Sequence, residues 1–456
     1  MSDLLRFLRE MAVKSLQEQW GSARVSIHDI AWAVTVPADW SDAAKQTMRN
    51  AAVDAGMVSS PTSRNLMLVH EPEAAAMASI KDQVHPVPFT EGQTFLVVDA
   101  GGGTVDITTH EVVRRDLQLA LSEVTHREGI LAGSTNMDSM FMDYAKTLLG
   151  RDAFEQWAER NPRDVATLKH KAWEEAKVAF DGTAGAIIDP MPSLMRAIPE
   201  EVWEGMEDLE GGSADSIHVP LHIMKYFFDS LIDQIRQAVQ RCLDRAQAAG
   251  VSVDYMLIAG GFGGSPYLIQ AMRDAFEHQL VKDVVCPGVP SQAVLKGATM
   301  YAQSPSTVYA RRSRFAYGVR CSTEWRDGLP QNLKFFESST NTVLCMECFS
   351  AMVEYDELVE HDQEVEHRFS AVRRFQPSMC FGIFACNNNR DHYTNAPAMR
   401  KLAELTMPIS DPSKVDPPRN YSMLVKFSFG ATELEVTAFD EQTREEVETS
   451  VVFVAD

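Results

Sequence analysis

The fold is decided by one stretch of the sequence, Asp99-Ala100-Gly101-Gly102-Gly103-Thr104-Val105-Asp106. A short apolar run, 94–98, precedes this stretch, and apolar residues alternate after it as far as Val113. Two strands joined by a glycine-rich turn predict a β-hairpin. Three successive glycines let the backbone turn without Cβ clashes, so that N–H groups can converge on one point and bind phosphate oxygens. Because Asp99 and Asp106 flank the turn, we expect a phosphate site with two carboxylates; a plain tight hairpin with surface aspartates is the alternative.

A second glycine-rich segment follows the apolar run 255–259 and precedes a predicted helix that ends at about Glu277. Its residues are Gly260-Gly261-Phe262-Gly263-Gly264-Ser265. Glycines at such a position allow a phosphate or a planar group to approach the N-terminus of a helix. The spacing matches neither the dinucleotide fingerprint nor the P-loop. Alone this segment is weak evidence, but together with the hairpin it favours a phosphate-containing ligand.

The first 300 residues alternate short apolar runs with helical patterns, which is typical of an α/β protein. We expect further strands at 30–36, 66–69 and 117–124, and helices at 3–19, 42–55, 73–82, 134–149, 162–180, 220–249 and 292–301. An acidic stretch at 200–210 is expected to be a solvated surface excursion. Beyond about residue 306, short alternating runs and proline-containing turns predict a β-rich domain.

Composition limits the classes of partner and compartment. The 456 residues suggest about three domains. The 42 basic and 64 acidic residues give a net charge of −22, which repels nucleic acid. No apolar stretch approaches the roughly 18 residues of a membrane span. Seven cysteines, an odd number, and the lack of a signal-peptide pattern favour a reducing compartment, cytosol or nucleus. Cys345-x-x-Cys348 raises a zinc question, but Cys380 and Cys386 have five residues between them, so we expect ordinary thiols.

The two glycine segments, in this order, resemble those of the actin-like ATPase superfamily. Finer matches are to the seventy-kilodalton heat-shock chaperones. These matches are Val34-Thr35-Val36-Pro37-Ala38, Glu71-Pro72-Glu73-Ala74-Ala75-Ala76, Glu174-Glu175-Ala176-Lys177 and Ala293-Val294-Leu295-Lys296-Gly297-Ala298. Trp32, the Glu-Pro-Glu variant and Gly-Gly-Phe-Gly-Gly-Ser-Pro-Tyr-Leu at 260–268 resemble the divergent branch called heat shock 70 kDa protein 12. The resemblance extends over essentially the whole chain.

The resemblance implies an α/β fold with actin-like, ribonuclease H-like nucleotide-binding lobes, of which the first is incomplete, followed by a β-rich C-terminal domain. The expected divisions are a remnant of the first lobe at 1–95, the second lobe at 96–305 with a helical subdomain at about 140–250, and the β-rich domain at 306–456.

The resemblance also implies ATP or ADP with Mg²⁺ as ligand, and it assigns a role to each matching residue. Gly101, Gly102, Gly103 and Thr104 would face the phosphates, while Asp99 and Asp106 would organise a hydrated Mg²⁺ ion. The catalytic set would be Asp106, Glu71 and Thr104. Gly260, Gly261 and Gly263 would line the adenosine pocket, with Glu174 and Lys177 over it. Pro37 would relay the nucleotide state; Lys45 and Val178 stand where the family has arginines.

Two elements of the family pattern have no counterpart in this sequence. They are an Asp-x-Gly-Thr-Thr phosphate loop after an opening strand, and a lysine that stabilises the transferring phosphoryl group; Asp181-Gly182-Thr183 follows a helix and is no substitute. Losing one preorganised donor commonly costs about 10²–10³ in rate, so we expect impaired hydrolysis. Four readings stay open: an ATP-binding, chaperone-type protein with client or partner proteins; a non-hydrolysing scaffold; an active ATPase whose start codon is misassigned; and a sugar kinase of the same superfamily.

Overall fold

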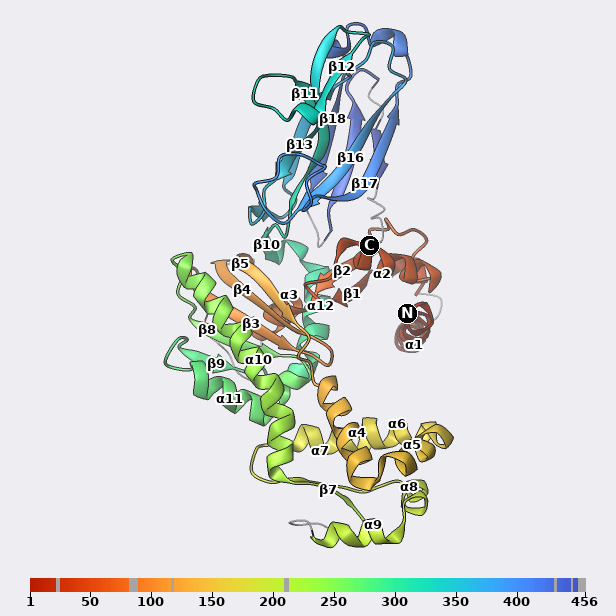
Figure 1. The fold of residues 1–456 in the computed structure, drawn as a ribbon, viewed down its shortest axis with the longest axis vertical. Helices are drawn as coiled ribbons and strands as arrows, with labels where there is room; N and C mark the ends of the chain where they lie inside the picture. Colours follow the sequence, from red (N-terminus) through yellow and green to blue (C-terminus); the bar gives the residue numbers. More distant parts are fainter. Residues whose placement is uncertain are drawn as a thin grey trace.

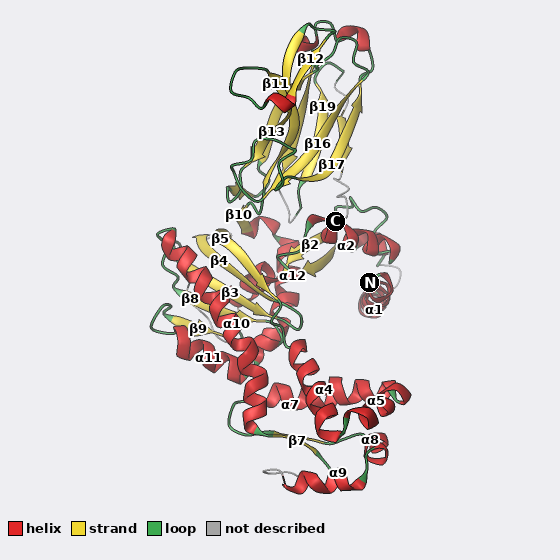
Figure 2. Cartoon of the chain, in the orientation of Figure 1, coloured by secondary structure: helices red, strands yellow, loops and turns green. Residues whose placement is uncertain are grey.

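The computed structural model describes residues 1–21, 25–81, 89–115, 119–208, 213–429, 433–443 and 446–449. Three regions follow one another along the long axis of the molecule (Figure 1). Figure 2 shows that β-sheets dominate one end, helices dominate the other, and a mixed α/β region lies between them. This mixed architecture with one large sheet confirms the predicted α/β class. Among the described residues, no helix has the length and apolar character needed to cross a membrane.

A seven-stranded sheet forms the centre of the molecule, in the order β14-β10-β5-β4-β3-β8-β9. In chain order its strands are β3 (Thr94–Ala100), β4 (Val105–Arg114), β5 (Ala120–Ile130), β8 (Tyr255–Ala259), β9 (Asp283–Val285), β10 (Val308–Arg312) and β14 (Leu358–Glu360). Strands β3, β4 and β5 are antiparallel, whereas β8 is parallel to β3 and to β9. The pairing of β3 with β4 confirms the predicted hairpin. Strand β10 is parallel to β5, so residues beyond 306 also take part in this sheet.

Helices cover both faces of the large sheet, and β3 is therefore buried on both sides. Leu96 and Val98 belong to the core cluster that includes α10 (Leu221–Ala248) and α11 (Pro266–Phe276). Phe95 and Val97 belong to the cluster of α3 (Glu71–Ile80) and α12 (Ala293–Gln303) on the other face. Side chains alternate across a strand, so a continuous apolar run is what a strand between two helical layers requires.

The alanine-rich sequence of α3 is explained by its close approach to α12. A Cβ atom placed on Gly297 would lie 1.7 Å from the carbonyl oxygen of Ala74. Glycine and alanine at the crossing let the two backbones touch, and any larger residue at 297 would force them apart.

The helical region packs around Trp157 and Trp173, which are both fully buried. It contains α4 (Thr135–Leu149), α5 (Arg151–Arg160), α6 (Pro162–Thr167), α7 (Trp173–Ala179), α8 (Pro192–Ala197), α9 (Glu200–Glu204) and the paired strands β6 (Ala186–Ile188) and β7 (Ile217–Val219). A π-helical turn joins α6 to α7, so the helix expected at 162–180 is interrupted. The sequence did not predict α5, α8 or α9. Part of the acidic stretch is α9, whose Trp203 is buried; residues 209–212 lie outside the described residues.

A small N-terminal group packs beside the large sheet. It consists of α1 (Ser2–Trp20), β1 (Trp32–Val36), α2 (Asp42–Asp54) and β2 (Leu66–His70), and β1 and β2 form a parallel pair. Leu5 of α1 is buried in the same cluster as Met48 of α2. Residues 82–88, which follow α3, lie outside the described residues.

Two facing sheets make up the C-terminal region. One contains β11 (Ala316–Glu324), β12 (Lys334–Glu337), β13 (Thr342–Val353), β16 (Ser378–Cys386) and β17 (Arg400–Pro408). The other contains β15 (Glu364–Ser370), β18 (Ser422–Ser428), β19 (Glu435–Asp440) and β20 (Glu446–Thr449). Their inward-facing residues share one core cluster, in which Val319, Met423 and Phe427 are fully buried.

Candidate functional site

The glycine hairpin brings its two aspartates face to face. Asp99 and Asp106 are directly paired in the β3–β4 ladder, and residues opposite each other in an antiparallel pair point to the same face. The turn is closed by a hydrogen bond from the amide of Gly101 to the carbonyl of Thr104 at 3.0 Å. The hydroxyl of Thr104 donates to a carboxylate oxygen of Asp106 at 3.1 Å. The hairpin therefore presents two carboxylates and one hydroxyl at its mouth.

The turn rests on the segment that begins α4. The amides of Ser134 and Thr135 donate to the carbonyls of Gly101 and Gly102 at 3.1 and 2.8 Å. The hydroxyl of Thr135 also donates to the carbonyl of Gly102, at 2.7 Å. A Cβ atom on Gly133 would lie 2.3 Å from that carbonyl oxygen, so this close backbone contact requires glycine at position 133. We did not single out Gly133-Ser134-Thr135 in the sequence; a glycine directly before a helix is the signal that could have found it.

The second glycine segment lies against the first. Gly260 has φ +88°, and a Cβ atom there would lie 2.2 Å from the carbonyl oxygen of Ala100 and 2.6 Å from a carboxylate oxygen of Asp99. At Gly263 a Cβ atom would lie 3.1 Å from Ile258, while Gly261 has open space beside it. Thus the end of β8 and the end of β3 meet at Asp99, as parallel neighbours should.

Two further segments complete the site from the N-terminal group. The backbone amide of Ala38, just after β1, donates to Asp106. Asp39 lies against Gly129, where a Cβ atom would come within 2.9 Å of its carboxylate, and Gly129 is the ladder partner of Asp106. Glu71 opens α3 and accepts a hydrogen bond from the side chain of Thr35. The sequence pointed to Glu71 but gave no reason to single out Asp39, because only the tertiary fold brings it to β5.

The carboxylates raise one another's pKa values. Burial, followed by the charges of Glu71 and Asp106, raises the pKa of Asp99 to about 8. Burial, followed by the charge of Asp106, raises the pKa of Glu71 to about 7. Burial and the charge of Asp39 raise the pKa of Asp106 to about 6, against the opposing effect of its hydrogen bonds. Like charges held together out of water behave in this way, and a cation placed among them would reverse the effect.

One polar atom of the site lacks a hydrogen-bond partner within the residues that the structure describes. One carboxylate oxygen of Asp106 is buried without a hydrogen-bond partner among the described residues. Yet no group of three or more His, Cys, Asp or Glu side chains that could hold a metal ion directly occurs in the described part of the chain. A cation whose first shell is mostly water, with one or two carboxylates around it, fits this arrangement, and Mg²⁺ commonly binds in that manner.

Glu174 and Lys177 of α7 form a separate network in the helical region. The ammonium of Lys177 lies 2.8 Å from Asp138 and 2.6 Å from Glu174, and the indole of Trp173 donates to the same Asp138 oxygen at 3.0 Å. Asp138 lies one turn along α4 from Thr135, which contacts the glycine hairpin. The contacts of Lys177 thus hold α7 against α4, and Val178 is exposed.

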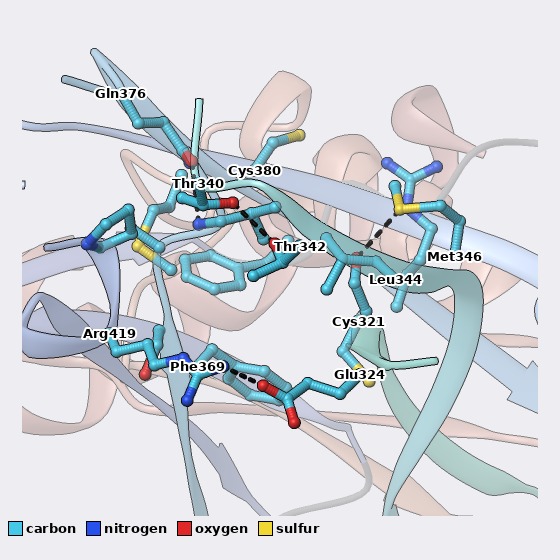
Figure 3. A pocket seen from close by; sticks show the side chains of 18 of the residues that line it. Cys321, Glu324, Thr340, Thr342, Leu344, Met346, Phe369, Gln376, Cys380 and Arg419 are labelled. Atoms are coloured by element: carbon cyan, nitrogen blue, oxygen red, sulfur yellow. Dashed lines mark hydrogen bonds and ion pairs between the residues drawn. The ribbon is translucent and has the colours of Figure 1, made fainter. Parts of the chain in front are cut away.

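Two cavities lie outside the glycine segments. One, of about 860 Å³, lies in the C-terminal region and is lined by both sheets (Figure 3). Phe369, Phe381 and Leu344 supply apolar surface, and Arg419 and Glu324 form an ion pair at its border. The other, of about 80 Å³, lies where α2, β5 and β10 meet the C-terminal region.

The cysteines are all free thiols. Cys345 and Cys348 lie on β13, and Cys348 is the ladder partner of Cys321 on β11. Burial, with the neighbouring thiols, raises the pKa of Cys321 to about 12. Burial likewise raises the pKa of Cys345, to about 11. A raised pKa favours the protonated thiol, whereas zinc binds thiolates.

Comparison with known proteins gives the site a family context. A family model described as a domain of unknown function, DUF8340, matches residues 89–285. Heat shock 70 kDa protein 12A of Homo sapiens is 24% identical over 99% of this chain and 74% of its own length. The human protein 12B is likewise 24% identical over the same shares. This chain is a homologue of the heat shock 70 kDa protein 12 branch.

The chain also matches a bacterial chaperone over a shorter length. The chaperone protein DnaK of Burkholderia cenocepacia is 24% identical over 59% of this chain and 37% of its own length. The resemblance read from the sequence to the 12-like branch is therefore confirmed, and the chain is an HSP70-like protein.

Proposed function

We propose that this protein binds ATP or ADP with Mg²⁺ where its two glycine segments meet. The observation that carries the proposal is the convergence of Glu71, Asp99 and Asp106 in one buried cluster, in which burial and mutual repulsion raise the pKa of each carboxylate and a cation would be stabilised. Glycine backbones lie directly beside them. HSP70-like relatives, among them a protein named as a chaperone, support a nucleotide as the ligand.

The proposed role of each site residue follows from its contacts. The backbone amides of Gly102 and Gly103, in the turn of the hairpin, bind phosphate oxygens. Asp99 and Asp106 orient the water molecules of a hydrated Mg²⁺ ion, and the bound cation supplies neutralisation of phosphate charge. Thr104 fixes the carboxylate of Asp106 by its hydrogen bond. Glu71, held by Thr35, is the group that can accept a proton from a water molecule close to neutral pH.

The other proposed contacts concern the adenosine side. Gly260 and Gly263 let the backbone lie against Ala100 and Ile258, and Gly261, which has open space beside it, is proposed to contact the planar group. Glu174 is half exposed at the outer side of its ion pair with Lys177, whereas Lys177 is buried between Glu174 and Asp138. We therefore assign Lys177 to positioning α7 and Glu174 to the ligand contact.

We propose the lobes of an actin-like ATPase as the framework of this site, with residues 1–95 belonging to the first lobe, 96–305 to the second, and 306–456 to the C-terminal domain. Strands β10 and β14 extend the sheet of the second lobe. Hydrolysis is proposed to be slow for this sequence. Within the described residues, Asp99, Asp106 and Glu71 form no ion pair with a lysine or arginine, and the charge of Arg127 makes only a small contribution to the pKa of Asp106. The site therefore offers phosphate binding without a lysine or arginine in direct contact with its carboxylates.

Calorimetric titration with ATP·Mg²⁺ and ADP·Mg²⁺ tests the proposal. We expect one nucleotide per chain, with affinity that weakens when Mg²⁺ is omitted. The variant Asp106→Asn should lose the Mg²⁺-dependent part, whereas Asp327→Asn, at an exposed loop position, should bind as the unmodified protein does. An absence of heat and of thermal stabilisation at millimolar nucleotide would leave the non-hydrolysing, non-binding scaffold as the function.

A second function, binding of client peptides, is favoured by the 860 Å³ cavity in the C-terminal region. Its lining combines apolar side chains, such as Phe369 and Leu344, with charged ones, such as Arg419 and Glu324, and this mixture suits an extended segment that carries both apolar and polar side chains (Figure 3). Fluorescence anisotropy with a labelled apolar peptide tests this, and Phe369→Asp should abolish binding while the nucleotide titration stays unchanged. The free thiols also favour a reducing compartment, cytosol or nucleus.

A further inference from the structure

The smaller cavity lies at the junction between the N-terminal group, the large sheet and the C-terminal region. Its lining comes from the start of α2, from β5, from the end of β10 and the residues after it, and from the segment around Phe429. In Figure 1 this is the place where β10 leads from the large sheet toward the C-terminal sheets and α2 lies close by. The proposed nucleotide site does not include any residue of this lining.

The lining is strongly cationic in a protein whose net charge is −22. It contains five cations and two carboxylates: Lys45, Arg127, Arg311, Arg312 and Arg314, against Asp42 and Glu433. Several of these charges already have partners outside or beside the cavity. Arg311 forms a bidentate pair with Glu73, Arg312 lies 3.9 Å from Asp356, and Glu433 is held by Arg49 at 2.7 and 2.8 Å.

Arg127 and Arg314 have no carboxylate within 4 Å among the described residues. Arg127 donates to Nδ1 of His70 at 3.2 Å, and burial lowers the pKa of His70 to about 3, so this imidazole is neutral. Arg314 donates to the backbone carbonyls of Asp39 and Trp40. Both guanidinium groups are thus bound only by neutral atoms, and each keeps further N–H donors.

The cations disfavour one another. Burial, together with the charges of Arg127 and Arg314, lowers the pKa of Lys45 to about 8, against the opposing charges of Asp42 and Glu433. Burial, followed by the charge of Arg127, lowers the pKa of Arg314, while Asp39 and Asp42 offset part of this. Burying like charges is costly unless opposite charges compensate them. Lys45 has Asp42 at 3.9 Å, whereas Arg127 and Arg314 have no carboxylate within 4 Å among the described residues, so these two guanidinium groups are the ones that an anion would compensate.

The size of the cavity limits what could compensate. A water molecule needs about 10–15 Å³ of such space, so about 80 Å³ holds a few waters or one tetrahedral oxyanion, and a nucleotide is too large. Ser41 and Ser313 also line the cavity and can supply hydroxyl groups. Three cations that converge from different elements and offer a fork of donors suit a phosphate or sulfate oxyanion better than a single halide ion.

We propose that this junction cavity binds one small tetrahedral oxyanion, inorganic phosphate being the physiological candidate, between Lys45, Arg127 and Arg314. The ion joins α2, β5 and the segment after β10, and it removes the repulsion among their cations. Its binding therefore stabilises the attachment of the C-terminal region to the rest of the chain. This proposal is independent of nucleotide binding at the glycine segments.

The test is a calorimetric titration of the full chain with sodium phosphate, and separately with sodium sulfate, against sodium chloride at matched ionic strength. We expect one site per chain with a Kd below about 1 mM, and a higher melting temperature in phosphate than in chloride. Arg127→Gln and Arg314→Gln should each weaken binding by about tenfold to a hundredfold, since each removes a hydrogen bond to a charged group. Arg326→Gln, at an exposed loop position, is the matched control.

Each other outcome overturns the proposal. If phosphate gives no saturable heat, the cavity is not an oxyanion site. If binding survives in both Arg127→Gln and Arg314→Gln, the ion binds elsewhere, for example at the glycine segments. Because Arg314 also holds backbone carbonyls, a poorly folded Arg314→Gln protein is replaced by Lys45→Gln, which leaves those bonds intact; unchanged binding in that variant counts against the site equally.

Discussion

Replacing Asp99 by asparagine should stabilise the ligand-free protein, although Asp99 lies at the centre of the proposed site. Its pKa is about 8 in the folded protein, against an ordinary 3.8, because it is buried beside Glu71 and Asp106. Between about pH 4 and pH 8 the folded chain therefore keeps a proton that the unfolded chain has released. Stability falls as the pH rises through this range and is constant above it. Asparagine carries no titrating proton, so the variant escapes this loss.

The size of the gain follows from the same difference. Each pKa unit corresponds to about 1.4 kcal/mol, so a difference of about four units sets an upper limit of about 6 kcal/mol. The three carboxylates share protons, and protonation of Glu71 relieves part of the repulsion on Asp99, which makes the realised gain smaller. We expect about 2–4 kcal/mol at pH 8 and almost none at pH 4.

Urea denaturation followed by tryptophan fluorescence measures this gain at pH 5, 6, 7 and 8. The control is Asp327→Asn, an exposed carboxylate, which should leave the free energy of unfolding unchanged at each pH. A second arm adds ADP·Mg²⁺, which should raise the stability of the unmodified protein and leave Asp99→Asn nearly unaffected. The reasoning is refuted if Asp99→Asn is less stable than the unmodified protein at pH 8, or if its advantage does not grow from pH 5 to pH 8.

Three further predictions concern packing, charge and metal. Gly297→Ala should cost at least about 1–3 kcal/mol in thermal unfolding, because its methyl group would overlap the carbonyl of Ala74, whereas Gly264→Ala, whose nearest neighbour would be 3.8 Å away, should cost little. Glu73→Gln should lower the free energy of unfolding by about 3–5 kcal/mol at pH 7, because the buried guanidinium of Arg311 loses its carboxylate. Glu441→Gln, in the exposed pair with Arg368, should cost at most about 1 kcal/mol. Elemental analysis of the purified protein should find substoichiometric zinc; one equivalent that is released by a thiol reagent would contradict the assignment of ordinary thiols.

The pH dependence of that Glu73 effect has a definite sign. Burial would raise the pKa of Glu73, but the Arg311 guanidinium, in its bidentate pair with this carboxylate, outweighs burial and holds the pKa well below its usual range. The unfolded carboxylate binds a proton at a higher pH than the folded one does. The stabilisation is therefore fully present above the ordinary pKa of a glutamate and is lost as the pH falls toward the folded value. Glu73→Gln should consequently differ less from the unmodified protein in acid than at pH 7.

Local sequence signals accounted for the parts of the site that lie within one supersecondary unit. The β3–β4 hairpin, with Asp99 opposite Asp106, follows from two apolar runs and three glycines, and all of these residues are close in sequence. The strand-to-helix turn at Gly260 is equally local. The large buried sheet was also visible as continuous apolar runs, since burial on both faces removes the alternation of polar residues.

Long-range pairing accounts for what the sequence did not reveal. Asp39 reaches Asp106 only because β1 and β5 come together, and nothing in the local pattern distinguishes it from a surface aspartate. Strand β10 pairs with β5 across nearly 190 residues, as the pairing of Val308 with Leu121 shows. The sequence alone therefore showed only a change near residue 306 from helical patterns to short alternating runs. Lys177 matched a family motif, yet the neighbour that fixes its position, Asp138, lies on another helix.

One short segment, 37–42, borders both of the proposed sites, and its contacts give a physical reason why they should be coupled. The amide of Ala38 donates to Asp106, the next two carbonyls accept from Arg314, and Asp42 accepts from the hydroxyl of Tyr317 on β11. A hydrogen bond to a carboxylate strengthens when that group is charged. A cation that ionises Asp106 therefore strengthens the hydrogen bond from the amide of Ala38. Pro37, whose φ is fixed, limits how far the backbone before Ala38 can adjust. The carbonyls that hold Arg314 belong to the same turn. We therefore expect nucleotide·Mg²⁺ at the glycine segments to change the affinity of the junction cavity for phosphate, although neither ligand needs the other in order to bind.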